Sequence, residues 1–139
     1  MKHALSFVAL GLLLVWAVPA QSQPPDVANE DISTFMRAKL VHSQKILEGL
    51  TVEDFDSVAG NAQALSLLSL SSNWNVLQTE QYVLYSKEFR RLADNLTKAA
   101  KEKNLDGATL SYVVMTTNCI HCHRHVRETR SGTGDSAKP

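Results

Sequence analysis

The chain of 139 residues is 44% hydrophobic and 20% charged, and its 14 basic and 14 acidic residues give a formal net charge of zero. Without an excess of positive charge it lacks the electrostatic attraction that drives binding to nucleic acid or to an anionic membrane surface, so we expect neither partner. It contains two cysteines. Both lie within one short motif, which leaves no disulfide framework of the kind that stabilises many small secreted domains.

The first twenty residues have the pattern of a secretory signal peptide. Lys2 and His3 form a short basic start, residues 4–18 are apolar, and the small Ala20 precedes the expected cleavage site. The apolar run is too short for a comfortable transmembrane helix. We therefore expect residues 1–20 to be removed and the protein to be periplasmic or otherwise exported; an uncleaved anchor is the alternative. Loss of Lys2 leaves 119 residues with 13 basic and 14 acidic side chains, enough for one modest domain.

Hydrophobic residues recur at helical spacing through the rest of the chain, and no segment has the alternating pattern of a half-buried strand. Pro24 and Pro25 mark a linker before the first helix, and the Gly- and Ser-containing end of the chain is expected to be disordered. The predicted segments are a linker over 21–28, helices over 29–48, 51–71, 79–104 and 106–130, and a tail over 131–139. Gly49 is expected to stop the first helix, and a capping-box variant, Thr51-Val52-Glu53-Asp54, to open the second. Thr79 is expected to cap the third helix, Asn104 to end it, and Asp106 to start the fourth.

Apolar stripes predict which faces of these helices are buried. Four amphipathic helices joined mostly by short turns predict an all-α fold, an up-down four-helix bundle over residues 29–130. In the fourth helix, Cys119 and Cys122 fall on the buried seam together with Met115. The other stripes are Ile32, Phe35, Met36, Leu40, Ile46, Leu47 and Leu50 in the first helix, Phe55, Val58, Ala62, Leu65 and Leu68 in the second, and Tyr82, Phe89, Leu92, Leu96 and Ala99 in the third.

The string Cys119-Ile120-His121-Cys122-His123 has the C-x-x-C-H spacing of a covalent attachment site for c-type haem. Two thiols three residues apart lie on one face of a helix, where both can form thioethers with the vinyl groups of one porphyrin. His123 is then placed to bind the iron through a neutral imidazole nitrogen. We expect a covalent haem c held by Cys119 and Cys122, with His123 as the axial ligand. Such attachment takes place outside the bacterial cytoplasm, so the signal peptide supports the motif.

The same side chains have alternative uses. A zinc site could use Cys119, Cys122 and His125, but structural zinc takes four ligands and the sequence offers no second ligand pair. A redox dithiol belongs at a strand-to-helix turn, for which there is no strand pattern. The alternative function is a zinc- or thiol-stabilised helical interaction module without haem. His121 and His125 share a face turned away from His123, so we expect both to point to solvent.

The haem motif on the last helix of a bundle of this size resembles cytochrome c′ and its low-spin relative cytochrome c-556. The match is carried by residues 119–123 and by Arg127, since the family commonly has a basic residue four positions after the haem histidine. The segment Met36-Arg37-Ala38-Lys39-Leu40 is similar to the family's distal helix. The resemblance implies a haem-binding bundle that pairs as a homodimer; the sequence does not identify its redox partner.

The sixth position of the iron decides what the haem would do. Met36, near the centre of the first stripe, would ligate through its thioether and give a six-coordinate electron carrier. An apolar residue such as Leu40 would leave the iron open to NO or CO. His42, about 240° around the helix from Met36, is the third candidate. Electron transfer fits each outcome, and no catalytic motif stands out, so we do not expect an enzyme.

Two basic residues are candidate partners of the haem carboxylates. Lys39 falls within the apolar stripe, where an unpaired ammonium is costly. Arg127 lies one helical turn beyond His123 on the same side. Haem propionates need charged partners in a partly desolvated cleft. We therefore hypothesise that Lys39, Arg127 or both bind the propionates; the alternative is that these long side chains extend to water.

Overall fold

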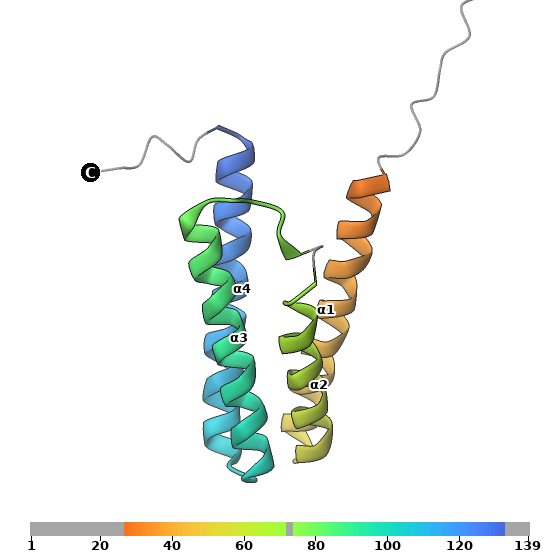
Figure 1. The fold of residues 1–139 in the computed structure, drawn as a ribbon. Helices are drawn as coiled ribbons and strands as arrows, with labels where there is room; N and C mark the ends of the chain where they lie inside the picture. Colours follow the sequence, from red (N-terminus) through yellow and green to blue (C-terminus); the bar gives the residue numbers. More distant parts are fainter. Residues whose placement is uncertain (1–26, 72–73, 133–139) are drawn as a thin grey trace, which may run out of the picture.

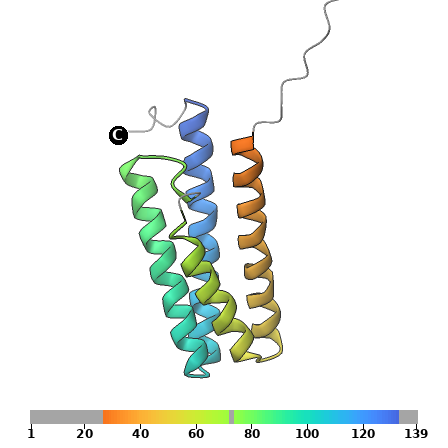
Figure 2. The same ribbon diagram turned by 45° about the vertical axis from the view of Figure 1, so that its right-hand side comes forward.

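The computed structural model describes residues 27–71 and 74–132, which form four α-helices and no β-strand. They are α1 (Val27–Thr51), α2 (Phe55–Leu68), α3 (Glu80–Lys101) and α4 (Leu105–Arg130). Successive helices run in opposite directions, as Figures 1 and 2 show, so the predicted all-α four-helix bundle is confirmed. No helix in these two described ranges is long and apolar enough to cross a membrane.

The turns after α1 and after α3 are built in the same way. Each helix is followed by a non-glycine residue with positive φ, Glu53 at 57° and Lys103 at 53°. The next residue, Asp54 or Asn104, donates its backbone N–H to a carbonyl five residues back. Its side chain then accepts a backbone N–H of the following helix and caps it, Asp54 from Ser57 and Asn104 from Gly107. Both turns lie at one end of the bundle, which we call the closed end (Figure 1).

These turns correct three of the predicted helix boundaries. The cap of α2 is Asp54 rather than Thr51, which is the last residue of α1. Asn104 does not end α3 but caps α4, which begins at Leu105 rather than at Asp106. The predicted cap Thr79 and the end of α4 at Arg130 are confirmed.

Gly49 does not stop the first helix. It lies inside α1, where a Cβ would come within 2.9 Å of Val58 Cγ2 and 3.1 Å of the Asp54 carbonyl oxygen. The absence of a side chain therefore lets α1 approach the start of α2 closely. At its other end α1 begins at Val27, so residues 27 and 28, predicted as linker, are helical. The predicted signal peptide and the rest of the linker lie outside the described residues, as do residues 133–139 of the predicted tail.

The core follows the predicted stripes most closely in α2, α3 and α4. Tyr82, Phe89, Leu92, Leu96 and Ala99 are all buried, as predicted for the third helix. In α1 the prediction fails for Leu40 and Leu47, which are 57% and 50% exposed. The reason is the placement of α1, which packs mainly on α2 and contacts α4 sparsely, so one edge of its apolar stripe stays uncovered. The largest side chains that are almost completely buried are Ile46, Val58, Leu65, Leu96 and Met115.

The bundle is less complete at the end opposite the two turns. The helix α2 has 14 residues, about 21 Å, against 25, 22 and 26 residues in α1, α3 and α4. Beyond Leu68 its place is taken by the connection to α3, residues 69–79, of which 72 and 73 are not described. Trp74 from this connection is 4% exposed. Its ring packs at 5.1 Å from that of Phe89 and at 6.5 Å from that of Phe35.

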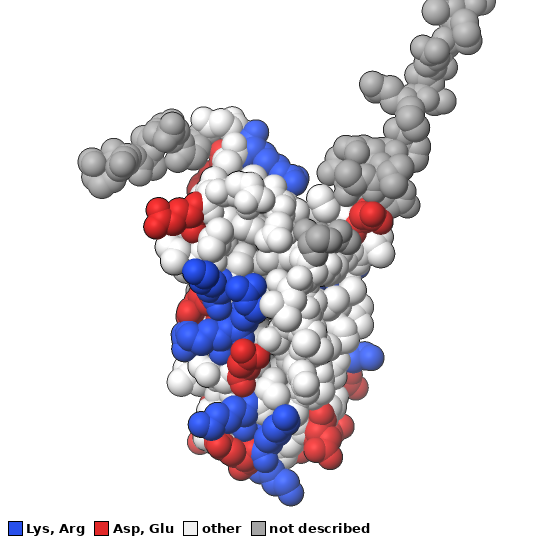
Figure 3. Space-filling model, viewed as in Figure 1, with Lys and Arg blue, Asp and Glu red and all other residues white. Residues whose placement is uncertain are grey.

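The surface drawn in Figure 3 carries charges of both signs. Blue and red side chains gather over α3 and at the closed end, whereas much of the face over α2 and α1 is uncharged. One charged pair on α3 is close, with the Arg91 guanidinium donating to Glu88 and lowering the pKa of that carboxyl. Since both members are exposed to water, the pair adds little to stability.

Candidate functional site

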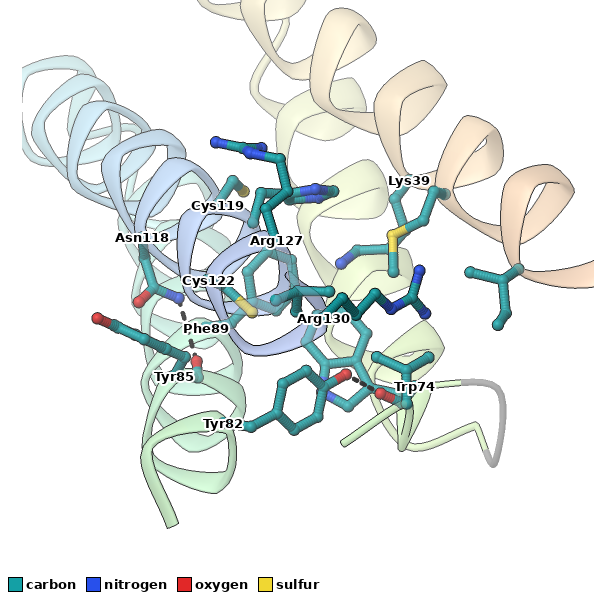
Figure 4. A pocket seen from close by; sticks show the side chains of 15 residues that line it. Lys39, Trp74, Tyr82, Tyr85, Phe89, Asn118, Cys119, Cys122, Arg127 and Arg130 are labelled. Carbon is teal, nitrogen blue, oxygen red and sulfur yellow. Dashed lines mark hydrogen bonds between the residues drawn. The ribbon is translucent and has the colours of Figure 1, made fainter. Parts of the chain in front are cut away.

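The best-defined pocket lies at the end of the bundle opposite the two turns, which we call the open end, between α1, the connection, α3 and α4. It has a volume of about 270 Å³. We call it the cysteine pocket because Cys119 and Cys122 line it together with His123. Figure 4 shows the two cysteines on α4 facing Lys39 on α1, with Trp74 and Tyr82 between them at the base. The pocket exists because α2 is short. At the closed end four helices fill the interior of the bundle, whereas at the open end three helices and the Trp74 side chain leave part of it empty.

Cys119 and Cys122 lie on the face of α4 that meets the rest of the bundle. Both are half-buried, and both pack against the core cluster, as the predicted seam requires. Burial raises the pKa of each thiol, although the positive charge of Lys39 acts in the opposite direction. Both thiols are therefore protonated at neutral pH, and both line the same cavity.

His123 reaches the same cavity from the next position on α4. Burial lowers the pKa of its imidazole, and the positive charges of Lys39 and Arg127 lower it further. The ring is therefore neutral at pH 7, which is the form that binds transition metals. The three residues of the motif that were predicted to act together do share one pocket.

The candidates for the sixth iron position separate in space. Met36 on α1 lines the cysteine pocket, and it also lines a smaller adjoining cavity of about 190 Å³ together with Leu40 and His123. His42 is placed elsewhere, since its Nδ1 lies 2.9 Å from Asn61 Oδ1 on α2. It contributes to neither of these cavities. The structure therefore leaves Met36 and Leu40 beside His123 and does not support His42 as a sixth ligand.

Lys39 neither extends to water nor pairs with a carboxylate of the described chain. Its ammonium lies 3.5 Å from the centre of the Trp74 ring and 4.4 Å from that of Phe89. Burial lowers the pKa of Lys39 to about 8. Contact with the negative faces of two aromatic rings offsets part of the cost of burying this charge. Lys39 thus lies inside the pocket as a cation and faces Cys119 and Cys122.

Two arginines complete the positive lining. Arg127, predicted from its spacing, and Arg130, which the sequence reading did not single out, both line the pocket from the last turns of α4. No carboxylate belongs to the lining that the described residues provide. A cavity with Lys39, Arg127 and Arg130 and no acidic side chain favours a molecule that carries negative charge.

Aromatic side chains form the wall opposite the arginines. Tyr82 and Phe89 from α3 and Trp74 from the connection line the pocket. The Tyr82 hydroxyl donates a hydrogen bond to the Trp74 carbonyl oxygen, which ties the connection to α3. The Trp74 indole Nε1, by contrast, is buried and has no hydrogen-bond partner among the described residues. Such a donor costs about 1–3 kcal/mol when it stays unsatisfied. Trp74 was not identified from the sequence as a pocket residue.

The two remaining histidines of α4 differ from each other. His121 is exposed, as predicted, and its ring lies 6.5 Å from that of Tyr85. His125 is half-buried, and its Nε2 lies 2.8 Å from Thr79 Oγ1, so the expectation that it points to solvent is wrong. No three His, Cys, Asp or Glu side chains of the described chain are grouped as a metal site, so Cys119, Cys122 and His125 are not brought together for zinc.

The chemistry of the cysteine pocket fits a haem c. Two thiols and a neutral imidazole lie on one side, aromatic rings form the wall and three cations are available for two propionates. The volume of about 270 Å³ is slightly below the range of about 300–1,000 Å³ that is usual for ligand pockets. Lys39 occupies part of the space, so a large flat molecule enters only when that side chain moves. Comparisons of the chain with protein-family models, with curated proteins and with solved structures found no match.

Proposed function

We propose that this protein is an exported c-type cytochrome of the cytochrome c′ and cytochrome c-556 kind, which transfers electrons, binds NO or CO, or does both. The observation that carries the proposal is that Cys119, Cys122 and His123 line one pocket whose remaining wall is aromatic and cationic. A bound haem would supply one-electron iron chemistry and a site for diatomic gases.

Each side chain of the pocket has a role in this proposal. The two thiols fix the cofactor covalently, and His123 offers a neutral nitrogen to the iron. Trp74, Tyr82 and Phe89 exclude water from one side of the pocket, which strengthens the electrostatic interactions made inside it. The side chains available for the sixth position are Met36, which gives a carrier, and Leu40, which leaves an open site.

The proposal is tested by making the protein in a bacterium with haem-attachment machinery and extracting it with acidic acetone. We expect a Soret band that stays with the polypeptide, because thioether bonds survive this treatment. The double variant Cys119→Ser with Cys122→Ser should lose the band entirely, and Cys122→Ser should retain at most one thioether. A matched control is Ser86→Cys combined with the double variant, which restores a thiol in the core but not the C-x-x-C-H spacing. Normal haem retention by the double variant refutes the proposal. Stoichiometric zinc in place of haem in the wild-type protein supports the interaction module.

The roles of Lys39 and Arg127 are tested separately on the haem-loaded protein. Replacing each by Gln removes a positive charge beside the proposed propionate positions. Positive charge near the haem favours the reduced iron. Because each variant removes one positive charge, we expect both to shift the haem midpoint potential downward. Lys45→Gln on the exposed face of α1 is the control and should leave the potential unchanged. An unchanged potential in both test variants refutes the pairing.

A further inference from the structure

The proposed function uses the Trp74 ring as part of the pocket wall but gives no role to its indole N–H. Trp74 is 4% exposed, and its ring faces are covered by the Lys39 ammonium at 3.5 Å and the Phe89 ring at 5.1 Å. Its indole N–H has no partner among the described residues. Buried donors in proteins are nearly always hydrogen-bonded, so this N–H needs an acceptor from outside the described chain.

The lining of the pocket defines the chemistry of that acceptor. Lys39, Arg127 and Arg130 line the same cavity as Trp74, and no acidic residue does within the described ranges. An acceptor drawn to three cations carries negative charge, and a carboxylate accepts a hydrogen bond from an indole as well as from an ammonium. Haem carries two such carboxylates.

We infer that the Trp74 indole N–H donates a hydrogen bond to a propionate of the bound haem and so helps to set its orientation and ionisation. This rests on the proposed function. The donor is held in place by the protein itself, since the Tyr82 hydroxyl bonds the Trp74 carbonyl oxygen and the Trp74 backbone N–H bonds the Ser71 carbonyl at 3.0 Å. Lys39 differs in this respect, because its long side chain must move when the pocket fills. Trp74 is therefore the fixed partner and Lys39 the mobile one.

The first measurement uses the wild-type protein. Trp16 lies in the segment expected to be removed, which leaves Trp74 as the sole tryptophan of the mature sequence. Ultraviolet resonance Raman bands that report indole hydrogen bonding then belong to one residue. We expect the band of the haem-loaded protein to show a hydrogen-bonded N–H, and that of the haem-free Cys119→Ser, Cys122→Ser protein to show a weaker or absent bond. Covalent haem with the same indole band in both proteins overturns the inference and leaves the proposed function standing, whereas failure to bind haem overturns both.

The second measurement compares two variants of the haem-loaded protein. Trp74→Phe keeps an aromatic ring but removes the N–H, whereas the control Tyr112→Phe removes a hydroxyl that contacts Ser43 Oγ outside the pocket. Because a hydrogen bond to a carboxylate lowers its pKa, Trp74→Phe should raise the acidic inflection of the midpoint potential against pH by about 1 pH unit. Tyr112→Phe should leave it in place. The other groups that face the site, namely Lys39, Tyr82, His123, Arg127 and Arg130, are unchanged in both variants. Equal inflections in the two variants overturn the inference.

Discussion

The two ends of the bundle are packed differently. At the closed end four helices meet, and two turns of the same design bring Ile46, Val58 and Leu96 into a core that excludes solvent. At the open end α2 is missing, and a single aromatic residue, Trp74, stands between α1 and α3. The first arrangement gives a core filled by side chains, and the second leaves the cysteine pocket.

The closed end contributes most to the stability of the fold, and the open end carries the reactive and charged groups. The closed end buries small and branched apolar side chains without a titratable group. The open end holds an ammonium with a lowered pKa, two thiols with raised pKa values and an unsatisfied indole N–H. The buried ammonium and the unsatisfied N–H each lower the stability of the haem-free chain, and a cofactor that pairs with them would remove part of that cost. The comparison predicts opposite responses to substitution at the two ends.

The largest effect is expected at the closed end. Leu96 is fully buried, so Leu96→Ala should lower the free energy of unfolding by about 2–5 kcal/mol through lost burial and a residual cavity. Urea denaturation of the haem-free protein measures this loss. Leu84→Ala on the same helix is the control, and it should change stability by less than about 0.5 kcal/mol because Leu84 is 51% exposed. Similar losses in the two variants would show that the closed end is not the stabilising core.

A smaller loss is expected at Met36, which is half-buried in the pocket wall. Met36→Ala should cost about 1–2 kcal/mol in the haem-free protein, less than a fully buried methionine. In the haem-loaded protein it separates the two uses of the iron. If Met36 ligates, the wild type is low-spin with a weak near-infrared sulfur-to-iron band, and the variant loses that band and binds CO. If the site is open, the wild type is already high-spin and binds CO, and the variant keeps its spin state.

Lys39→Met should stabilise the haem-free protein, in contrast to Leu96→Ala. A fall in pKa from 10.5 to about 8 corresponds to about 3 kcal/mol at neutral pH, and the two ring contacts return about 0.5–2 kcal/mol of this. The expected net gain is about 1–2 kcal/mol by urea denaturation at pH 7. Lys45→Met on the exposed face of α1 is the control and should change little.

The same substitution has a pH signature. Below pH 8 Lys39 is charged in both the folded and the unfolded chain, so the burial penalty is complete. Between about pH 8 and 10.5 the folded protein loses this proton first, and the penalty disappears as pH rises. The stability of the wild type relative to Lys39→Met should therefore increase across this range. A difference that does not vary with pH would contradict the burial of the ammonium.

The smallest effect is expected at the turns of the closed end. Asp54→Ala and Asn104→Ala should each cost about 1 kcal/mol, because each removes a side-chain acceptor for a backbone N–H at a helix start. Asn95→Ala, at an exposed position within α3, is the control and should stabilise slightly, by less than about 0.7 kcal/mol, because Ala has the higher helix propensity. Thermal unfolding followed by circular dichroism is sensitive enough to compare the three variants. Unequal losses at Asp54 and Asn104 would show that the two turns are not equivalent.

Local sequence signals were sufficient for the fold. The stripe of α3 and the cap at Thr79 were predicted correctly because both depend on residues within a few positions of each other. The turns were predicted less well, since a glycine was expected to stop α1 and the turns instead place Glu53 and Lys103 in the left-handed region. A glycine is needed at position 49 because α2 packs closely against it, and the local sequence does not reveal this contact between helices.

The candidate site was predicted in part. The spacing of Cys119, Cys122 and His123 was enough to place them on one face of α4, and the structure brings them to one pocket. The contact of Lys39 with Trp74 joins residues 35 positions apart, and it depends on how far α2 extends, which no helical period encodes. For the same reason the contact of His42 with Asn61 could not be predicted from helical spacing.

The two short turns also determine the order in which the chain can assemble. They join α1 to α2 and α3 to α4 as helical hairpins, whose contacts close small loops and form early in folding. The cysteine pocket is lined by Lys39 from the first hairpin and by Cys119 and Cys122 from the second. It therefore forms only when the two hairpins, joined by the longer connection, pack against each other. We therefore expect the thiols to remain accessible to a modifying enzyme through the early folding steps and to become enclosed at the last one.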